Sequence, residues 1–128
     1  MKFFSLVRAL LRRRDPRHAL GAAGEAAALK FLRQQGCSEV DRNVRTPHGE
    51  IDLIVSDGDA LVFVEVKVRA TRGATPAKLQ VDRGKQKRLR LAAQHELKRR
   101  RWRGSSRSDV VARDGDAPFE WLKGAVSF

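Results

Sequence analysis

Hydrophobic and polar residues follow two different periods along the first half of the chain. Between residues 19 and 35, small and apolar side chains recur every three or four positions, which predicts a helix with one buried face, and Gly36 is placed to end it. Residues 51–55 and 61–68 alternate instead, which is typical of strands. The sequence SDGD at 56–59 lies between them and predicts a short hairpin turn.

The second half of the chain predicts one further helix and one or two further strands. The long segment at 81–101 has the spacing of a helix, with Leu89, Ala93 and Leu97 on its buried side and basic residues almost everywhere else. In the first half, an edge strand is also predicted at 38–45 and a turn at 46–49. In the second half, we further expect a loop at 70–78, a strand at 105–113, a turn at 114–118 and a final strand or short helix at 119–128.

Taken in order, these elements predict an α/β fold. The coarse order is αβββαβ, and adjacent strands joined by tight turns between helices favour a mixed sheet flanked by helices. With 128 residues, one domain is expected, spanning residues 19–128. Residues 1–18 predict a basic N-terminal arm or short helix, since RRR follows the apolar run rather than preceding it as in a signal peptide.

The charge of the chain narrows the choice of partner. Lys and Arg number 27 against 15 Asp and Glu, a formal net charge of +12, and the pI is about 11.2. Such a domain favours a polyanionic partner, most simply DNA or another nucleic acid. No apolar run reaches the length of a membrane span, so no membrane partner is expected. Cys37 is the only cysteine, which excludes an internal disulfide and fits a cytoplasmic location.

Two acidic residues interrupt strands that are otherwise suited to burial. By alternation, Asp52 shares a face with Ile54, while Glu65 and Lys67 share a face with Phe63. Pairing across the hairpin can bring Asp52 close to Glu65 and Lys67, although the sequence does not fix the register. The opposite faces, expected to be buried against a helix, carry Ile51, Leu53, Val55, Val62, Val64, Val66 and Val68.

Two carboxylates and one ammonium group in this arrangement suit a divalent cation. Neighbouring carboxylates repel each other, and a bound Mg²⁺ or Mn²⁺ removes that repulsion while keeping positions for water and a phosphate oxygen. Lys67 would then orient the attacking water or neutralise charge on the phosphate. The alternative is that Glu65 and Lys67 line a solvated sheet face, and that Asp52 pairs with an arginine.

Basic residues beside these strands and along the second predicted helix are candidates for phosphate contacts, whose strength falls as salt rises. Trp102 either stacks on an unpaired base or packs beneath the helix end. The candidate nucleic-acid contacts are Arg42, Asn43, Arg45, Arg69, Lys85, Lys87, Arg88, Arg99, Arg100, Arg101 and Trp102.

The motif GEIDLI, followed at hairpin distance by FVEVK, resembles the PD-(D/E)XK nuclease superfamily, which has a restriction-endonuclease-like fold. Across residues 21–121 the chain more closely resembles the bacterial YraN family (UPF0102), through GAAGEAAALKFL, RNVR, KQKRL, SDVVA and EWLKGA. The YraN core is similar to archaeal Holliday junction resolvases. In this chain Ile51 stands in place of the proline of the superfamily motif.

The resemblance implies a set of site residues. Asp52, Glu65 and Lys67 would form the catalytic motif, Glu25 would join Asp52 and Glu65 as a metal ligand, and Gln86 would contact a phosphate or water. The implied function is a Mg²⁺- or Mn²⁺-dependent DNA endonuclease, acting on branched or structured DNA and forming a homodimer. The alternatives are a non-catalytic nucleic-acid-binding module and an adaptor of a DNA-processing complex.

Overall fold

The computed structural model describes residues 16–70 and 82–126, with side chains described from Gly21 onward. The first helix, α2, spans Pro16–Gln34, so it starts three residues earlier than the pattern predicts. Residues 16–18 therefore belong to this helix, while the rest of the predicted arm lies outside the described residues. Gly36 ends the helix as expected, with a φ of 96° and a hydrogen bond from its N–H to the Arg33 carbonyl.

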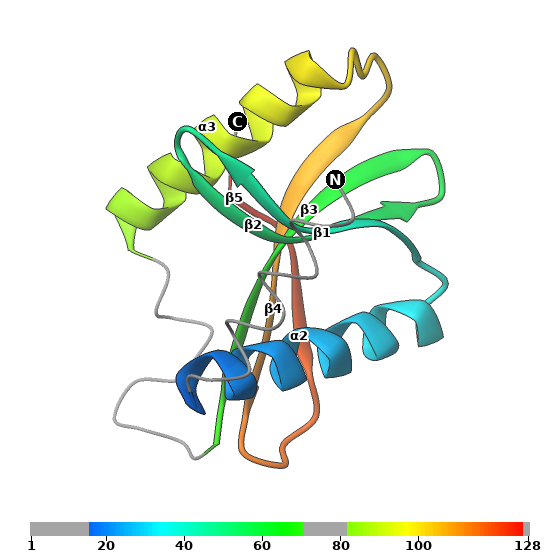
Figure 1. The fold of residues 1–128 in the computed structure, drawn as a ribbon. Coiled ribbons are helices and arrows are strands. Elements are labelled where there is room, and N and C mark those ends of the chain that lie inside the picture. The colour runs from blue at the N-terminus through cyan, green and yellow to red at the C-terminus, as the bar shows by residue number, and fades with distance from the viewer. Residues whose placement is uncertain (1–15, 71–81, 127–128) are drawn as a thin grey trace.

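Five strands form one mixed sheet in the order β1-β2-β3-β4-β5, and Figure 1 shows α2 and α3 on opposite sides of it. Neighbouring strands are antiparallel except β3 and β4, which are parallel because α3 carries the chain across between them. The elements after α2 are β1 (Ser38–Thr46), β2 (Gly49–Asp57), β3 (Ala60–Arg69), α3 (Arg83–Arg99), β4 (Ser106–Asp114) and β5 (Glu120–Val126).

The α/β fold with a mixed sheet flanked by helices is thus confirmed. The segment left open as a final strand or short helix is a strand, which adds one element to the predicted order. Most of the predicted loop at 70–78 lies outside the described residues. No helix in the described ranges is long and apolar enough to cross a membrane.

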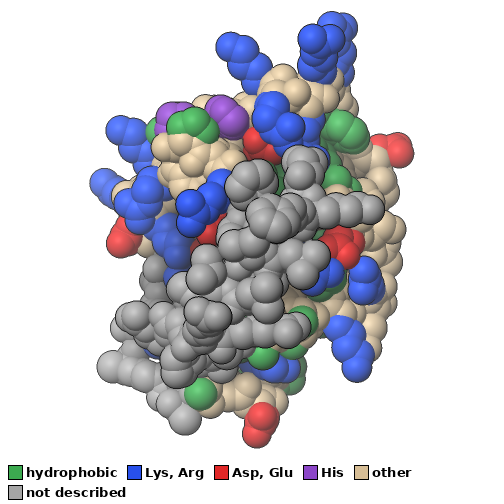
Figure 2. Space-filling view, in the orientation of Figure 1, with side chains coloured by type: hydrophobic (Ala, Val, Ile, Leu, Met, Phe, Trp, Pro, Cys, Tyr) green, Lys and Arg blue, Asp and Glu red, His purple; other side chains and the backbone are tan. Residues whose placement is uncertain are grey.

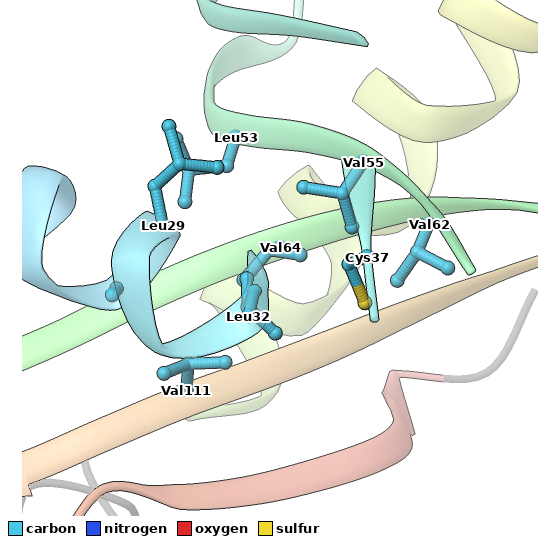
Figure 3. Packing of buried hydrophobic residues seen from close by; sticks show 9 residues of the cluster. Leu29, Leu32, Cys37, Leu53, Val55, Val62, Val64 and Val111 are labelled. Atoms are coloured by element: carbon cyan, nitrogen blue, oxygen red, sulfur yellow. The ribbon is translucent and has the colours of Figure 1, made fainter. Parts of the chain in front are cut away.

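Each face of the sheet is covered by one helix through its own apolar cluster. Leu29 and Leu32 of α2 pack with Leu53, Val55 and neighbouring valines on one face, as Figure 3 shows. The cluster on the other face belongs to α3 and contains Val44, Ile51, Ile54, Leu61, Phe63, Ala92 and Ala93. The prediction that the valine-rich face is buried against a helix is therefore confirmed.

Ile51 was expected to share a buried face with Leu53 and Val55, and this expectation is wrong. Backbone pairing between β2 and β3 runs from Asp57 and Ala60 to Leu53 and Val64, whereas β2 stays paired with β1 at Ile51. Strict alternation therefore fails where β2 leaves β3, and Ile51 joins the α3-side cluster. This divergence opens the sheet beside Asp52.

Helix α2 approaches β3 closely at Gly24. A Cβ atom at this position would lie 3.0 Å from the Cβ of Val68, which is tighter than nine in ten real Cβ contacts. Because the Val68 Cβ is fixed to the strand backbone, a larger residue would require the helix and the strand to move apart by a few tenths of an ångström. The same close approach sets the position of Glu25, the next residue of the helix.

We expect Gly24→Ala to destabilise the protein by about 1–2 kcal/mol, because overpacking against Val68 outweighs the better helix propensity of alanine. Gly21→Ala is the matched control: its Cβ would meet nothing within 4 Å, so that substitution should stabilise by up to about 1 kcal/mol. Chemical denaturation of both variants measures the difference. Equal stability gains would contradict the close packing.

Candidate functional site

The central feature of the site is the approach of Asp52 to Glu65. One residue beyond the last backbone pair of β2 and β3, Asp52 Oδ2 accepts a 2.8 Å hydrogen bond from the Val66 N–H. The Asp52 side chain thereby takes the place of a strand carbonyl. This bond holds Asp52 against β3 beside Glu65, which is only 7% exposed. The predicted convergence of these two acids is present in the structure.

Two lysines reach the same oxygen of Glu65. Lys67 Nζ lies 3.8 Å from Glu65 Oε1, and Lys85 Nζ lies 2.5 Å from it. Lys85 comes from the first turn of α3, where its backbone N–H donates to the N-cap side chain of Asp82 at 2.8 Å. Burial lowers the pKa of Lys67, and the neighbouring Lys85 lowers it further.

The pKa of Asp52 is raised well above its usual range. Burial is the main cause, the charge of Glu65 is the second, and the charge of Glu25 adds to them, while the hydrogen bond from Val66 opposes the shift. An acid in this state is costly to ionise unless a cation comes near. The site thus favours the binding of positive charge.

A pocket of about 220 Å³ opens in front of these acids, between the β1–β2 turn and α3. His48 lies in the turn at this rim, with its ring centroid 6.3 Å from that of His95. The pocket is lined by His48, Gly49, Glu50, Asp52, Glu65, Lys85, Arg88, Leu89 and Ala92.

Glu25 and Gln86, the two other predicted site residues, come from different helices. Glu25 is half-buried on α2 and acts electrostatically on both Asp52 and Arg42. Gln86 is half-buried in the first turn of α3, where its backbone N–H donates to the Asp82 carbonyl at 2.8 Å. Neither residue lines the pocket.

The site supplies two adjacent carboxylates as possible ligands of a divalent cation. Within the described residues, no group of three His, Cys, Asp or Glu side chains is arranged to hold a metal ion. Mg²⁺ is commonly held by one or two carboxylates, with waters and substrate phosphates completing its shell. The adjacent carboxylates of Asp52 and Glu65 at an open pocket fit that pattern, and the charge of Glu25 also acts on Asp52.

Lys and Arg side chains gather over α3 in the upper part of the face in Figure 2. Among the basic candidates, the exposed ones are Arg42, Arg45, Lys87, Arg88, Arg99 and Arg101. Two of these and the three half-buried candidates form ion pairs within the protein: Arg42 with Glu39, Arg69 with Asp114, Lys85 with Glu65, Arg99 with Glu96, and Arg100 with Glu96 and Asp41.

Two candidates have distinct local structures. Asn43 adopts a φ of 53° within β1, a conformation that asparagine tolerates better than most residues, and it falls between the pairs Arg42–Leu53 and Val44–Ile51. Trp102 follows α3 and is 38% exposed. Its Nε1–H donates to the Ser105 carbonyl at 2.9 Å, which ties the ring to the loop that follows the helix.

Sequence reasoning missed two charged residues that organise this region. Lys85 was assigned only to nucleic-acid contact, and its ion pair with Glu65 depends on a contact between α3 and β3 that no local pattern reveals. Glu96 is 1% exposed and accepts hydrogen bonds from Arg99 and Arg100, so it anchors α3. A lone acid at helical spacing from Ala92 and Ala93 was the available signal for Glu96.

Fold and site together define a small α/β protein with a paired-acid pocket where its sheet opens. The family model of the uncharacterised protein family UPF0102 matches residues 24–112, and the chain belongs to this family. A UPF0102 protein of Janthinobacterium sp. (strain Marseille) is 45% identical over 118 residues, covering 92% of this chain and 95% of that protein.

Two further relatives extend the comparison. The UPF0102 protein of Herminiimonas arsenicoxydans is 44% identical over 117 residues, covering 91% of this chain and 94% of the relative. That of Neisseria gonorrhoeae (strain NCCP11945) is 39% identical over 107 residues, covering 83% and 93%. The expected membership of the YraN (UPF0102) family is therefore confirmed.

We expect Asp52→Asn to stabilise the metal-free protein at pH 7 by about 1 kcal/mol or more, because the amide keeps an acceptor for the Val66 N–H and removes a charge. Because the pKa of Asp52 is raised in the folded protein, the stability difference between the variant and wild type should grow as pH rises. Below about pH 4 the carboxyl is protonated in both folded and unfolded chains, so the variant gains nothing. As pH rises above about 4, only the unfolded chain ionises freely, and wild type loses stability relative to the variant.

Denaturant titrations in EDTA between pH 3.5 and 8 measure this difference. A variant that is less stable than wild type at pH 7, or a difference independent of pH, would contradict the electrostatic account of the site.

Proposed function

We propose that this protein is a metal-dependent DNA endonuclease that hydrolyses phosphodiester bonds with Mg²⁺ or Mn²⁺. One observation carries the proposal: Asp52 and Glu65 meet at an open pocket with Lys67 and Lys85 beside them. The resemblance of GEIDLI and FVEVK to the PD-(D/E)XK motif supports the same function, and so does the net charge of +12.

Each residue has a role in the proposed reaction. Asp52 and Glu65 would hold the divalent cation, with Glu25 as an additional acid. When bound, the cation polarises the scissile phosphate and lowers the pKa of a bound water. The Lys67 ammonium group, 3.8 Å from Glu65, would donate a hydrogen bond that orients this water. Gln86 would contact a phosphate or water from the start of α3.

The exposed basic residues would position the nucleic acid. Arg88 lines the pocket, and Lys87 lies beside it on the exposed side of α3. Phosphate contacts of this kind give affinity without sequence preference, so DNA binding should weaken steeply with added salt. A branched or structured DNA substrate is proposed from the resemblance to the resolvases, and a homodimer would supply two sites for it. A cytoplasmic location agrees with such a role.

A purely DNA-binding role does not account for the acids. A binding surface for phosphates gains nothing from two adjacent carboxylates, one of them hard to ionise, because they repel the same polyanion that the basic residues attract. A metal-dependent site does need them. This difference favours catalysis over the alternative of a binding module.

The test is cleavage of labelled duplex, single-stranded and four-way-junction DNA with Mg²⁺ or Mn²⁺, against EDTA. We expect metal-dependent cleavage of at least one substrate, and a loss of about 100-fold or more in Asp52→Asn. Asp59→Asn, an exposed acid in the β2–β3 turn, is the matched control and should cut at the wild-type rate.

Binding is measured in the same samples by fluorescence anisotropy. Wild type that binds DNA but cuts none of the substrates would overturn the proposal in favour of a binding module. Wild type that neither binds nor cuts would overturn it in favour of an adaptor.

A further inference from the structure

Two features of its surroundings disfavour the positive charge of Lys85. It lies in the first turn of α3, where the helix dipole is positive and no acidic residue occurs within the turn itself. Its ammonium group also lies on the same Glu65 oxygen that Lys67 approaches. Only nearby acids offset these two costs.

Glu65 and Asp52 provide that compensation. Glu65 is buried, and a buried carboxylate without a partner is strongly destabilising. Lys67 alone stands 3.8 Å away, whereas Lys85 makes direct contact with Glu65 Oε1. Lys85 thus supplies the positive charge that the acid pair needs when no other cation is present.

The ion pair also competes with the proposed metal for Glu65. An ammonium group in contact with Glu65 Oε1 takes one acceptor position of the carboxylate and repels a divalent cation bound to the same group. The backbone of Lys85 is fixed by the Asp82 cap, but its long side chain is 26% exposed and can turn toward the pocket mouth. A phosphate there would meet both the ammonium group and the positive end of α3.

We propose, on the basis of the proposed function, that Lys85 is a positioning residue. In the metal-free protein its ammonium group pairs with Glu65. When a divalent cation binds to Glu65, the ammonium group moves to a substrate phosphate. Lys85 therefore weakens metal binding by the protein alone and couples it to nucleic-acid binding. By linkage, each ligand then strengthens the binding of the other.

The test is Mn²⁺ binding to the full chain by isothermal titration calorimetry, without nucleic acid. We expect Lys85→Gln to bind Mn²⁺ about 5-fold or more tightly than wild type, because the competing ammonium group is gone. Arg83→Gln removes the same charge from an exposed position two residues away in the first turn of α3, and should stay within about 2-fold of wild type.

Lys85→Arg gives a prediction of opposite sign. A guanidinium group can hold Glu65 through two parallel hydrogen bonds, so this variant should bind Mn²⁺ more weakly than wild type. Circular dichroism establishes that each variant is folded. If Lys85→Gln does not fold, the Arg variant alone decides the question.

Coupling is measured by repeating the titration with a phosphorothioate oligonucleotide, which resists cleavage. The oligonucleotide should tighten Mn²⁺ binding more in wild type than in Lys85→Gln.

Wild-type affinity for Mn²⁺ in a folded Lys85→Gln variant, or equal tightening by the oligonucleotide in both proteins, overturns the role of Lys85 and leaves the metal site standing. Absence of Mn²⁺ binding by both wild type and Lys85→Gln overturns the proposed metal-dependent function as well.

Discussion

The close approach of two like charges, Asp52 and Glu65, is the constraint on which the rest of this structure depends. Neither acid can move away: Asp52 is tied to the Val66 N–H, and Glu65 is buried in β3. Burial, and after it their mutual repulsion, raises the pKa of Asp52 and favours a cation nearby. Lys67 and Lys85 supply positive charge from two different elements, and the open pocket admits more.

The fold brings these groups together through a few specific contacts. Divergence of β2 from β3 beyond Leu53 frees a backbone N–H for Asp52 and opens the sheet. On one side, Gly24 lets α2 pack against Val68, which brings Glu25 within electrostatic range of Asp52. On the other side, the Asp82 cap fixes the first turn of α3 and hence Lys85. Ion pairs of Glu96 with Arg99 and Arg100 anchor the far end of that helix.

Local patterns were sufficient for the elements and for the acid pair. Alternation placed Glu65 and Lys67 on one face of β3, and the short turn at Gly58 set the hairpin that brings Asp52 to them. Alternation failed at Ile51, because a strand that leaves its partner no longer keeps a strict period. Local patterns were silent on the pairing of Lys85 with Glu65 and of Arg100 with Asp41, since both join residues distant in sequence.

The chain belongs to the UPF0102 family, and its relatives align with most of its length. The most direct test of a metal site at the two acids is a crystal structure of the protein with Mn²⁺, with the metal located by its anomalous scattering. We expect a peak in contact with the carboxylates of both Asp52 and Glu65. A map with no peak there, or with Mn²⁺ bound only elsewhere on the protein, would contradict this expectation.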